Sequence, residues 1–154
     1  MRKRRTMQGS VAIEFALVFG VFMALFYAAV SYGVVFMLIQ SFTYAAEDGL
    51  RAALKVDCTG IDANACTSDR IAPAVQAQVA TTLSWLPAAI KTQVLGNNGQ
   101  NVQVNCGSAD ATCEAVVQYS NYAANPLVPV IQLPIIGSVP KLPVNLAGRA
   151  RLRI

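Results

Sequence analysis

The sequence predicts an α+β fold in which one long N-terminal helix continues into a small exported domain with one or two further helices and a small antiparallel sheet. Three observations predict this fold. An uncharged run of 25 residues, Phe15–Ile39, lies near the N-terminus. The stretch Gln40–Val56 contains no proline and only one glycine, so the helix is expected to continue through it. After Asn97, apolar residues alternate with polar ones, which is the period of strands.

The uncharged run is long enough to cross a membrane. At about 1.5 Å per residue a helix of this length covers roughly 37 Å, compared with roughly 30 Å of bilayer hydrocarbon. Before the run stand Arg2, Lys3, Arg4 and Arg5. Such an excess of Lys and Arg on a short flank places that end in the cytoplasm. We therefore expect a single-pass protein of the cytoplasmic membrane whose C-terminal domain lies outside. A secretory signal peptide is disfavoured because its apolar region is normally about 7–15 residues long.

The apolar run carries one charge at its start and a regular series of small residues. The carboxylate of Glu14 is disfavoured there unless it reaches the interface or meets a positive partner. Small residues recur at every fourth position, a spacing that lets membrane helices pack closely; they are Ala12, Ala16, Gly20, Ala24 and Ala28. The helix is therefore either shaped to pack against copies or relatives of itself or an alanine-rich anchor that touches only lipid. In the same way, Glu14 either pairs with a neighbouring chain or extends to the head groups without a partner.

The residues around Glu14 resemble a prepilin leader and its cleavage site. Gly9 would be the last leader residue, Ser10 the first mature residue, and Glu14-Phe15 the fifth and sixth mature positions, as in the G/xxxxE[FY] pattern of Tad (tight adherence) pilins. A second stretch, Ala45–Ala53, resembles the A-A-x-x-G-x-R-x-A segment that follows the membrane helix in TadE-like proteins. Over the rest of the chain the resemblance is one of general plan only.

The resemblance implies a TadE-like pseudopilin or minor pilin with a pilin-like fold that takes part in assembling a Tad (Flp-type) adhesive pilus. It implies cleavage between Gly9 and Ser10 by a prepilin peptidase, and assembly contacts through Glu14 and Phe15. The implied partners are that peptidase, other pilins and pseudopilins, and the assembly platform in the membrane. The protein would stay in the membrane, enter the filament or cap it, and the sequence leaves these three roles open.

On this interpretation the chain divides into four parts. They are a leader at 1–9, a transmembrane helix at 10–44, a helix extension at 45–56 and an exported α+β domain at 57–154. The alternative is an uncleaved single-pass membrane protein whose extracytoplasmic domain has a binding or inhibitory role.

Composition argues against an enzyme and against nucleic-acid binding. The sequence has no histidine, the commonest general base and metal ligand. No Walker-type, GxGxxG or GxSxG motif occurs. The formal charge is +4, but four of the twelve basic residues lie in the leader, so cleavage would leave eight basic and eight acidic side chains. We expect no catalytic site, no cofactor and no nucleic-acid partner.

The four cysteines form two closely spaced pairs, Cys58-x7-Cys66 and Cys106-x6-Cys113. Structural zinc usually requires C-x2–4-C spacing, so disulfides are favoured over a metal site in an exported domain. Four cysteines allow three connectivities. The two short local loops are the simplest of them.

After the long helix, residues 57–69 are polar and predict a loop. An apolar helical face follows, with members three or four residues apart: Ile71, Val75, Val79, Leu83 and Leu86. A cap at Thr67, Ser68 or Asp69 would start this helix, because Pro73 is tolerated only near a helix start.

A further short helix is expected between Pro87 and Gly96, since proline favours the first turn of a helix and glycine its end. Trp85, just before it, is expected to be a core or interface anchor. Turn residues then follow at Asn97–Asn101.

Two strands are expected around the Cys106–Cys113 connection, one at Val102–Val104 and one at Glu114–Tyr122, so that a disulfide would link a hairpin. Asn125–Val144 holds five of the seven prolines and predicts an extended surface segment. The chain closes as a strand with one apolar and one basic face, the latter formed by Arg149, Arg151 and Arg153. Such a basic face is expected to protect a solvated sheet edge.

Overall fold

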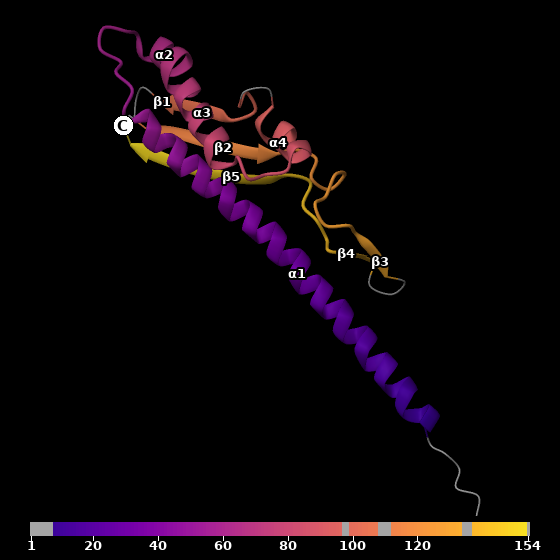
Figure 1. Cartoon of the computed structure of the whole chain (residues 1–154). Coiled ribbons are helices and arrows are strands. Elements are labelled where there is room, and N and C mark those ends of the chain that lie inside the picture. The colour runs from indigo at the N-terminus through magenta and orange to yellow at the C-terminus, as the bar shows by residue number, and fades with distance from the viewer. Residues whose placement is uncertain (1–7, 97–98, 108–111, 134–136, 154) are drawn as a thin grey trace, which may run out of the picture.

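The computed structural model describes residues 8–96, 99–107, 112–133 and 137–153. One long helix, α1 (Gln8–Ala53), extends well beyond a small domain that packs on its C-terminal half (Figure 1). The domain contains α2 (Ala63–Cys66), η1 (Thr67–Ile71), α3 (Ala72–Thr82), α4 (Ala88–Leu95), β1 (Gln103–Gly107), β2 (Thr112–Tyr119), β3 (Ile131–Leu133), β4 (Gly137–Val139) and β5 (Leu146–Arg153). The predicted α+β fold, with a long N-terminal helix and a small antiparallel sheet, is confirmed.

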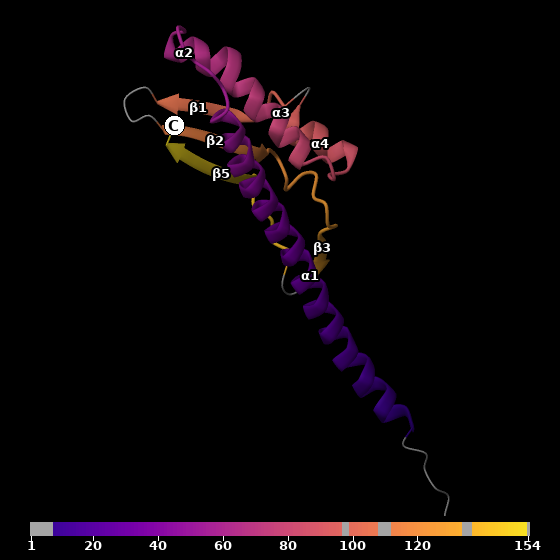
Figure 2. The same cartoon turned by 60° about the vertical axis from the view of Figure 1, so that its left-hand side comes forward.

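Three strands form an antiparallel sheet in the order β1-β2-β5. The β1–β2 hairpin pairs Cys106 with Cys113, and β2 pairs with β5 along its whole length, from Thr112 opposite Arg153 to Tyr119 opposite Leu146. α1 runs close to β5 in both views (Figures 1 and 2). The strands β3 and β4 form a separate short hairpin below the domain, in the direction of the free end of α1 (Figure 1).

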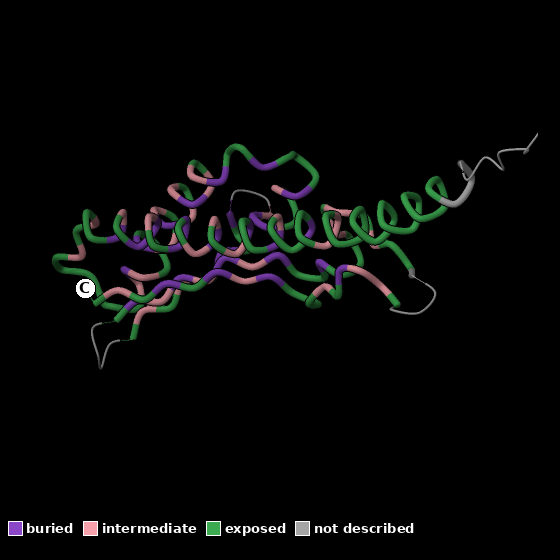
Figure 3. Tube along the Cα trace, turned by 90° about the horizontal axis from the view of Figure 1, so that it is seen from below, coloured by how far each residue is buried: buried purple, intermediate pink, exposed green. Residues whose placement is uncertain are grey.

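α1 is continuous, but its two halves have different surroundings. Every residue from Val11 to Phe26 is exposed, whereas from Ser31 onward residues at helical spacing are buried (Figure 3). The buried residues are Ser31, Val35, Leu38, Phe42, Ala45, Ala46, Gly49, Leu50 and Ala53. We call 11–30 the free half and 31–53 the packed half. The predicted division at residue 44 corresponds to no break in the backbone, so it stays a prediction about the membrane.

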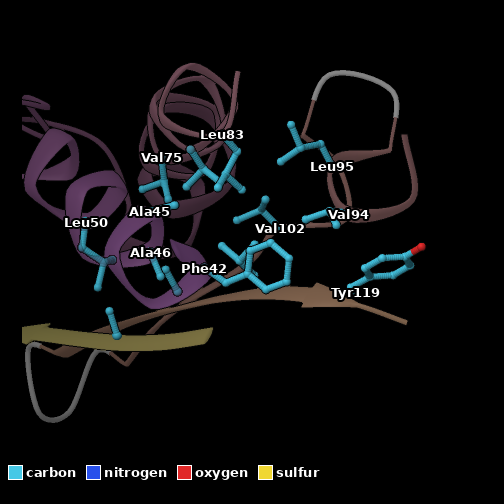
Figure 4. Close-up of a cluster of buried hydrophobic side chains, with 14 of the residues drawn as sticks. Phe42, Ala45, Ala46, Leu50, Val75, Leu83, Val94, Leu95, Val102 and Tyr119 are labelled. Atoms are coloured by element: carbon cyan, nitrogen blue, oxygen red, sulfur yellow. The ribbon is translucent and has the colours of Figure 1, made fainter. Parts of the chain in front are cut away.

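The core lies between the packed half, α3 and the sheet (Figure 4). Phe42 has no exposed surface and lies near Val102, close to the sheet. The apolar face predicted for the second helix is confirmed, since all five of its members are buried. α4 is also confirmed, with Pro87 at its N-cap and Gly96, at φ 66°, at its C-cap.

The predicted loop at 57–69 is wrong in its second part, because helix begins at Ala63. Asp62 is the N-cap, and its carboxylate accepts a hydrogen bond from the amide of Asn64 at 3.1 Å. The predicted caps, Thr67, Ser68 and Asp69, therefore lie inside helical structure. The wider turn of η1, in which the Ala72 amide donates to the carbonyl of Thr67, explains why the following Pro73 is tolerated.

Three surface predictions have mixed outcomes. Trp85 is 49% exposed, so a core position is wrong; it lines a surface groove together with Phe36 and Tyr44 of the packed half, and a role as an interface anchor stays a prediction. The proline-rich segment is extended, as expected, but forms the β3–β4 hairpin. The C-terminal strand is confirmed as a sheet edge whose arginines are exposed while Ala150 is buried.

Candidate assembly surface

The predicted cleavage residues lie at the start of α1. Gly9 and Ser10 belong to its first helical turn. The basic residues Arg2–Arg5 lie outside the described residues. Gly9 and Ser10 are located by their backbone alone. Cleavage there stays a prediction.

Glu14 and Phe15 project from the free half. Both side chains are exposed, Phe15 to 68%. Phe15 stacks on Phe19 with ring centroids 5.7 Å apart, and Phe22 on Phe26 at 6.2 Å. Within the described part of the chain the only ion pair joins Arg151 to Glu114, so Glu14 has no cationic partner there.

The small-residue ridge also lies in the free half, where it meets little of the chain itself. Ala12, Ala16, Gly20 and Ala24 are exposed, and Ala28 is partly buried. A Cβ at Gly20 would find nothing within 4 Å. From Ala12 to Gly20 the ridge is therefore accessible to a neighbouring helix, and packing against one stays a prediction.

The packed half approaches α3 closely at Gly49, where glycine is otherwise costly in a helix interior. A Cβ there would come within 2.8 Å of Val79 Cγ2 and 3.0 Å of Val75 Cγ1. Close packing of α1 against α3 therefore explains the glycine at this position.

Hydrogen bonds from α3 to Asp48 reinforce this contact. The Oδ2 atom of Asp48 accepts from Gln78 Nε2 at 2.7 Å and from Thr82 Oγ1 at 2.8 Å. These two bonds hold the pKa of the Asp48 carboxyl below its ordinary value, because they favour the charged form.

β5 meets the other side of the packed half through Gly148. A Cβ at this position would overlap the backbone of Phe42 and Thr43. Any larger side chain would therefore separate the strand from the helix, and glycine lets the two backbones touch.

The β3–β4 hairpin meets α1 lower down, where the free half begins. The Tyr27 hydroxyl donates to the carbonyl of Pro129, and the Lys141 amide donates to the Tyr32 hydroxyl at 3.2 Å. An apolar groove of about 420 Å³ lies between the hairpin and the helix; Met23, Ala24, Phe26, Tyr27, Val30, Ile131 and Val139 line it.

Two disulfides constrain the domain. Cys58 bonds to Cys66 between the end of α1 and α2, and Cys106 bonds to Cys113 across the β1–β2 hairpin. These are the two local loops that the cysteine spacing favours. The second disulfide joins directly opposed residues of the hairpin.

Sequence reasoning did not single out the tyrosines, Asp48 or Gly148 as contacts. The tyrosines could have been noticed, because Tyr27 and Tyr32 carry the only phenolic hydroxyls in the uncharged run. A glycine inside a strand pattern, such as Gly148, also suggests a close backbone approach. Asp48 gives no such signal, because its partners lie about 30 residues further along the chain.

The architecture defines a class of protein: one N-terminal apolar helix, long enough to cross a membrane, followed by a small α+β domain, which fits a single-pass membrane protein. The family described as TadE-like protein matches residues 9–51. The match confirms the TadE-like resemblance over these residues and supports a Tad pilus-related protein that associates with pilus components in general. No curated protein and no solved structure matches the chain.

Proposed function

We propose that this protein is a TadE-like pseudopilin or minor pilin that takes part in assembling a Tad adhesive pilus. The observation that carries the proposal is the extent of the family match, which begins at Gly9 and ends at Arg51. It thus starts at the proposed cleavage site and includes the whole free half with Glu14. The role is structural, without a catalytic site or cofactor.

In this proposal the N-terminus is cytoplasmic and the domain lies on the other side of the membrane. A prepilin peptidase removes residues 1–9 at the cytoplasmic face, which leaves Ser10 as the new N-terminus. The basic flank supports this orientation, and an extracytoplasmic domain suits the two disulfides, which persist in oxidising spaces.

Glu14 provides the assembly contact. After cleavage each chain carries an α-ammonium at Ser10, about one helical turn from Glu14. A neighbouring helix that packs along the exposed small-residue ridge, shifted by about one turn, would place its ammonium next to this carboxylate. Both charges would then be satisfied near the apolar boundary, where an unpaired carboxylate is costly.

N-terminal sequencing of the protein purified from its native membrane tests the processing step. We expect the sequence to begin at Ser10, and Gly9→Val to accumulate the full-length precursor because a side chain before the cut would not fit a pocket shaped for glycine. Gly20→Val is the matched control, since Gly20 has open space around it and lies far from the cut. A wild-type chain that keeps Met1 or Arg2 in assembled pili would contradict the proposal and favour an uncleaved membrane anchor.

A further inference from the structure

We propose that the β3–β4 hairpin lies in the outer leaflet of the membrane, with phospholipid acyl chains filling the groove between the hairpin and α1. This inference rests on membrane insertion of α1, as in the proposed function. It adds a second membrane-embedded element, a short β-hairpin, to the long apolar helix. It also moves the outer membrane boundary on α1 from residue 44 to the neighbourhood of Tyr32.

The length of α1 supports the new boundary. From Glu14 to Tyr32 the helix rises about 27 Å, close to the roughly 30 Å of bilayer hydrocarbon. A span from 10 to 44 would measure about 51 Å, which needs a tilt beyond the usual range of about 0–40°. Burial agrees, because the domain buries one face of α1 from Ser31 onward, whereas every residue from Val11 to Phe26 is exposed.

Tyrosines mark the boundary. Tyr and Trp are enriched at membrane–water interfaces, where the ring contacts lipid and the polar tip reaches the head groups. Tyr32 is 48% exposed and its hydroxyl accepts a hydrogen bond from the amide of Lys141. This bond fixes the backbone of Lys141 at the level of Tyr32, from which its exposed side chain can extend the ammonium to the phosphate groups of the lipid.

Below Tyr32 the hairpin follows the helix into the apolar region. The groove extends along α1 from Val30 to Met23, which corresponds to depths of about 3–13 Å beneath Tyr32. Its lining residues are apolar apart from the Tyr27 hydroxyl, and Ile131 remains 44% exposed beside it. No charged residue occurs between Glu114 and Lys141 in the sequence, so the hairpin brings no ionised group into the lipid.

Pairing between the two strands satisfies the inner backbone groups of the hairpin, while its open outer edges suit a shallow position near the head groups, because unsatisfied amides and carbonyls are expensive in hydrocarbon. β3 pairs with β4 from Ile131 opposite Val139 to Leu133 opposite Gly137. Pro129 and Pro140, on either side, have no amide hydrogen to satisfy. The Pro129 carbonyl accepts the hydrogen bond of Tyr27, so a side chain of α1 serves the hairpin at this depth.

Tryptophan quenching in the full-length protein tests the proposal. Three single-tryptophan proteins are reconstituted in phosphatidylcholine–phosphatidylglycerol vesicles: the wild type with Trp85, Trp85→Phe with Ile131→Trp, and Trp85→Phe with Phe19→Trp. Emission is measured with a lipid that carries a nitroxide near the glycerol end of its acyl chain, and separately with aqueous iodide.

We expect the tryptophan at 131 to lose emission to the nitroxide lipid to about the same fraction as the one at 19, and to lose little to iodide. Trp85 should show the reverse. If position 131 is quenched by iodide as Trp85 is, the hairpin is outside the membrane and the inference fails, while quenching at 19 shows that insertion of α1 stands. If neither position responds to the nitroxide lipid, membrane insertion itself fails. Protection of position 131 from both quenchers overturns the inference in favour of a protein that covers the hairpin.

Discussion

The two halves of α1 are both apolar and form one unbroken helix, yet one half is exposed and the other forms the centre of the domain core. Apart from Glu14 near its start, the free half is apolar on all sides, a pattern suited to lipid. The packed half has one buried face, while Gln40, Glu47 and Arg51 are exposed. The two halves therefore differ mainly in how polar residues are distributed around the helix, and less in mean hydropathy. This distribution distinguishes the half that would meet lipid from the half that packs against the domain.

Truncating one phenylalanine in each half should give the largest difference in domain stability between the two halves. Phe42→Ala removes a fully buried ring and should lower the free energy of unfolding of the domain by about 3–5 kcal/mol. Phe22→Ala, at a residue that is 57% exposed, should leave it unchanged. Denaturant titration of the full-length proteins in detergent, followed by Trp85 emission, measures both, and equal losses would contradict the division of the helix.

Two glycine-to-alanine substitutions, one for each half of α1, test the division of the helix into a free and a packed half by adding a methyl group. Gly148→Ala should cost about 1–3 kcal/mol of domain stability or more, because the new Cβ overlaps the backbone of Phe42 and Thr43 and neither can move aside easily. Gly20→Ala meets no atom within 4 Å and should not destabilise the domain. The same titration applies. A Gly148→Ala domain as stable as wild type would show that β5 does not lie against α1 in this way.

The smallest effect concerns pH and the α1–α3 contact. Because the folded-state pKa of Asp48 is lowered by its hydrogen bonds, its charge stabilises the fold above the unfolded pKa of about 3.9, and this contribution is lost as the pH falls through the folded value. Thermal unfolding between about pH 2 and 6 should therefore depend less steeply on pH in Asp48→Asn than in wild type.

Asp57→Asn is the matched comparison for the acid titration. The pKa of Asp57 is also lowered, by hydrogen bonds from Thr59, but this carboxyl lies in the loop after α1 and joins no two helices. Because this carboxyl is exposed, its replacement should flatten the pH dependence less than Asp48→Asn does, with a correspondingly smaller loss of stability at pH 7. Asp48→Ala should lower the stability at pH 7 by about 1–3 kcal/mol, because two bonds to a charged group disappear.

Local patterns in the sequence predicted most of the elements. The long helix, the apolar face of α3, the proline and glycine at the ends of α4, and the basic edge strand all follow from periodicity and from residues with strong backbone preferences. The start of the second helix was misplaced because residues 63–69 are mostly polar and resemble a loop until Asp62 caps them. The wider turn of η1 also lets the helical structure run on into Pro73, in the first turn of α3, where an unbroken α-helix would reject a proline.

Long-range contacts could not be predicted from these patterns. Where the domain packs along α1 depends on Gly148 meeting Phe42 and on Asp48 meeting Gln78, and no periodicity connects such distant positions. The same holds for the candidate site, whose local motif could be predicted from the sequence but whose long-range contacts could not. Its residues Gly9, Ser10 and Glu14 come from a local motif, whereas the hairpin beside Tyr27 comes only from the fold.

We expect the free half to make the protein's external contacts, while the packed half serves its own domain. Glu14→Gln and Glu47→Gln apply the same neutralisation to one exposed carboxylate in each half. Both variants are expressed in the native host, and pili are counted while co-purification of the other pilins is measured. We predict that Glu14→Gln inserts and is cleaved normally but loses most piliation and co-purification, whereas Glu47→Gln behaves as wild type. Normal pili and unchanged co-purification in Glu14→Gln would contradict the claim.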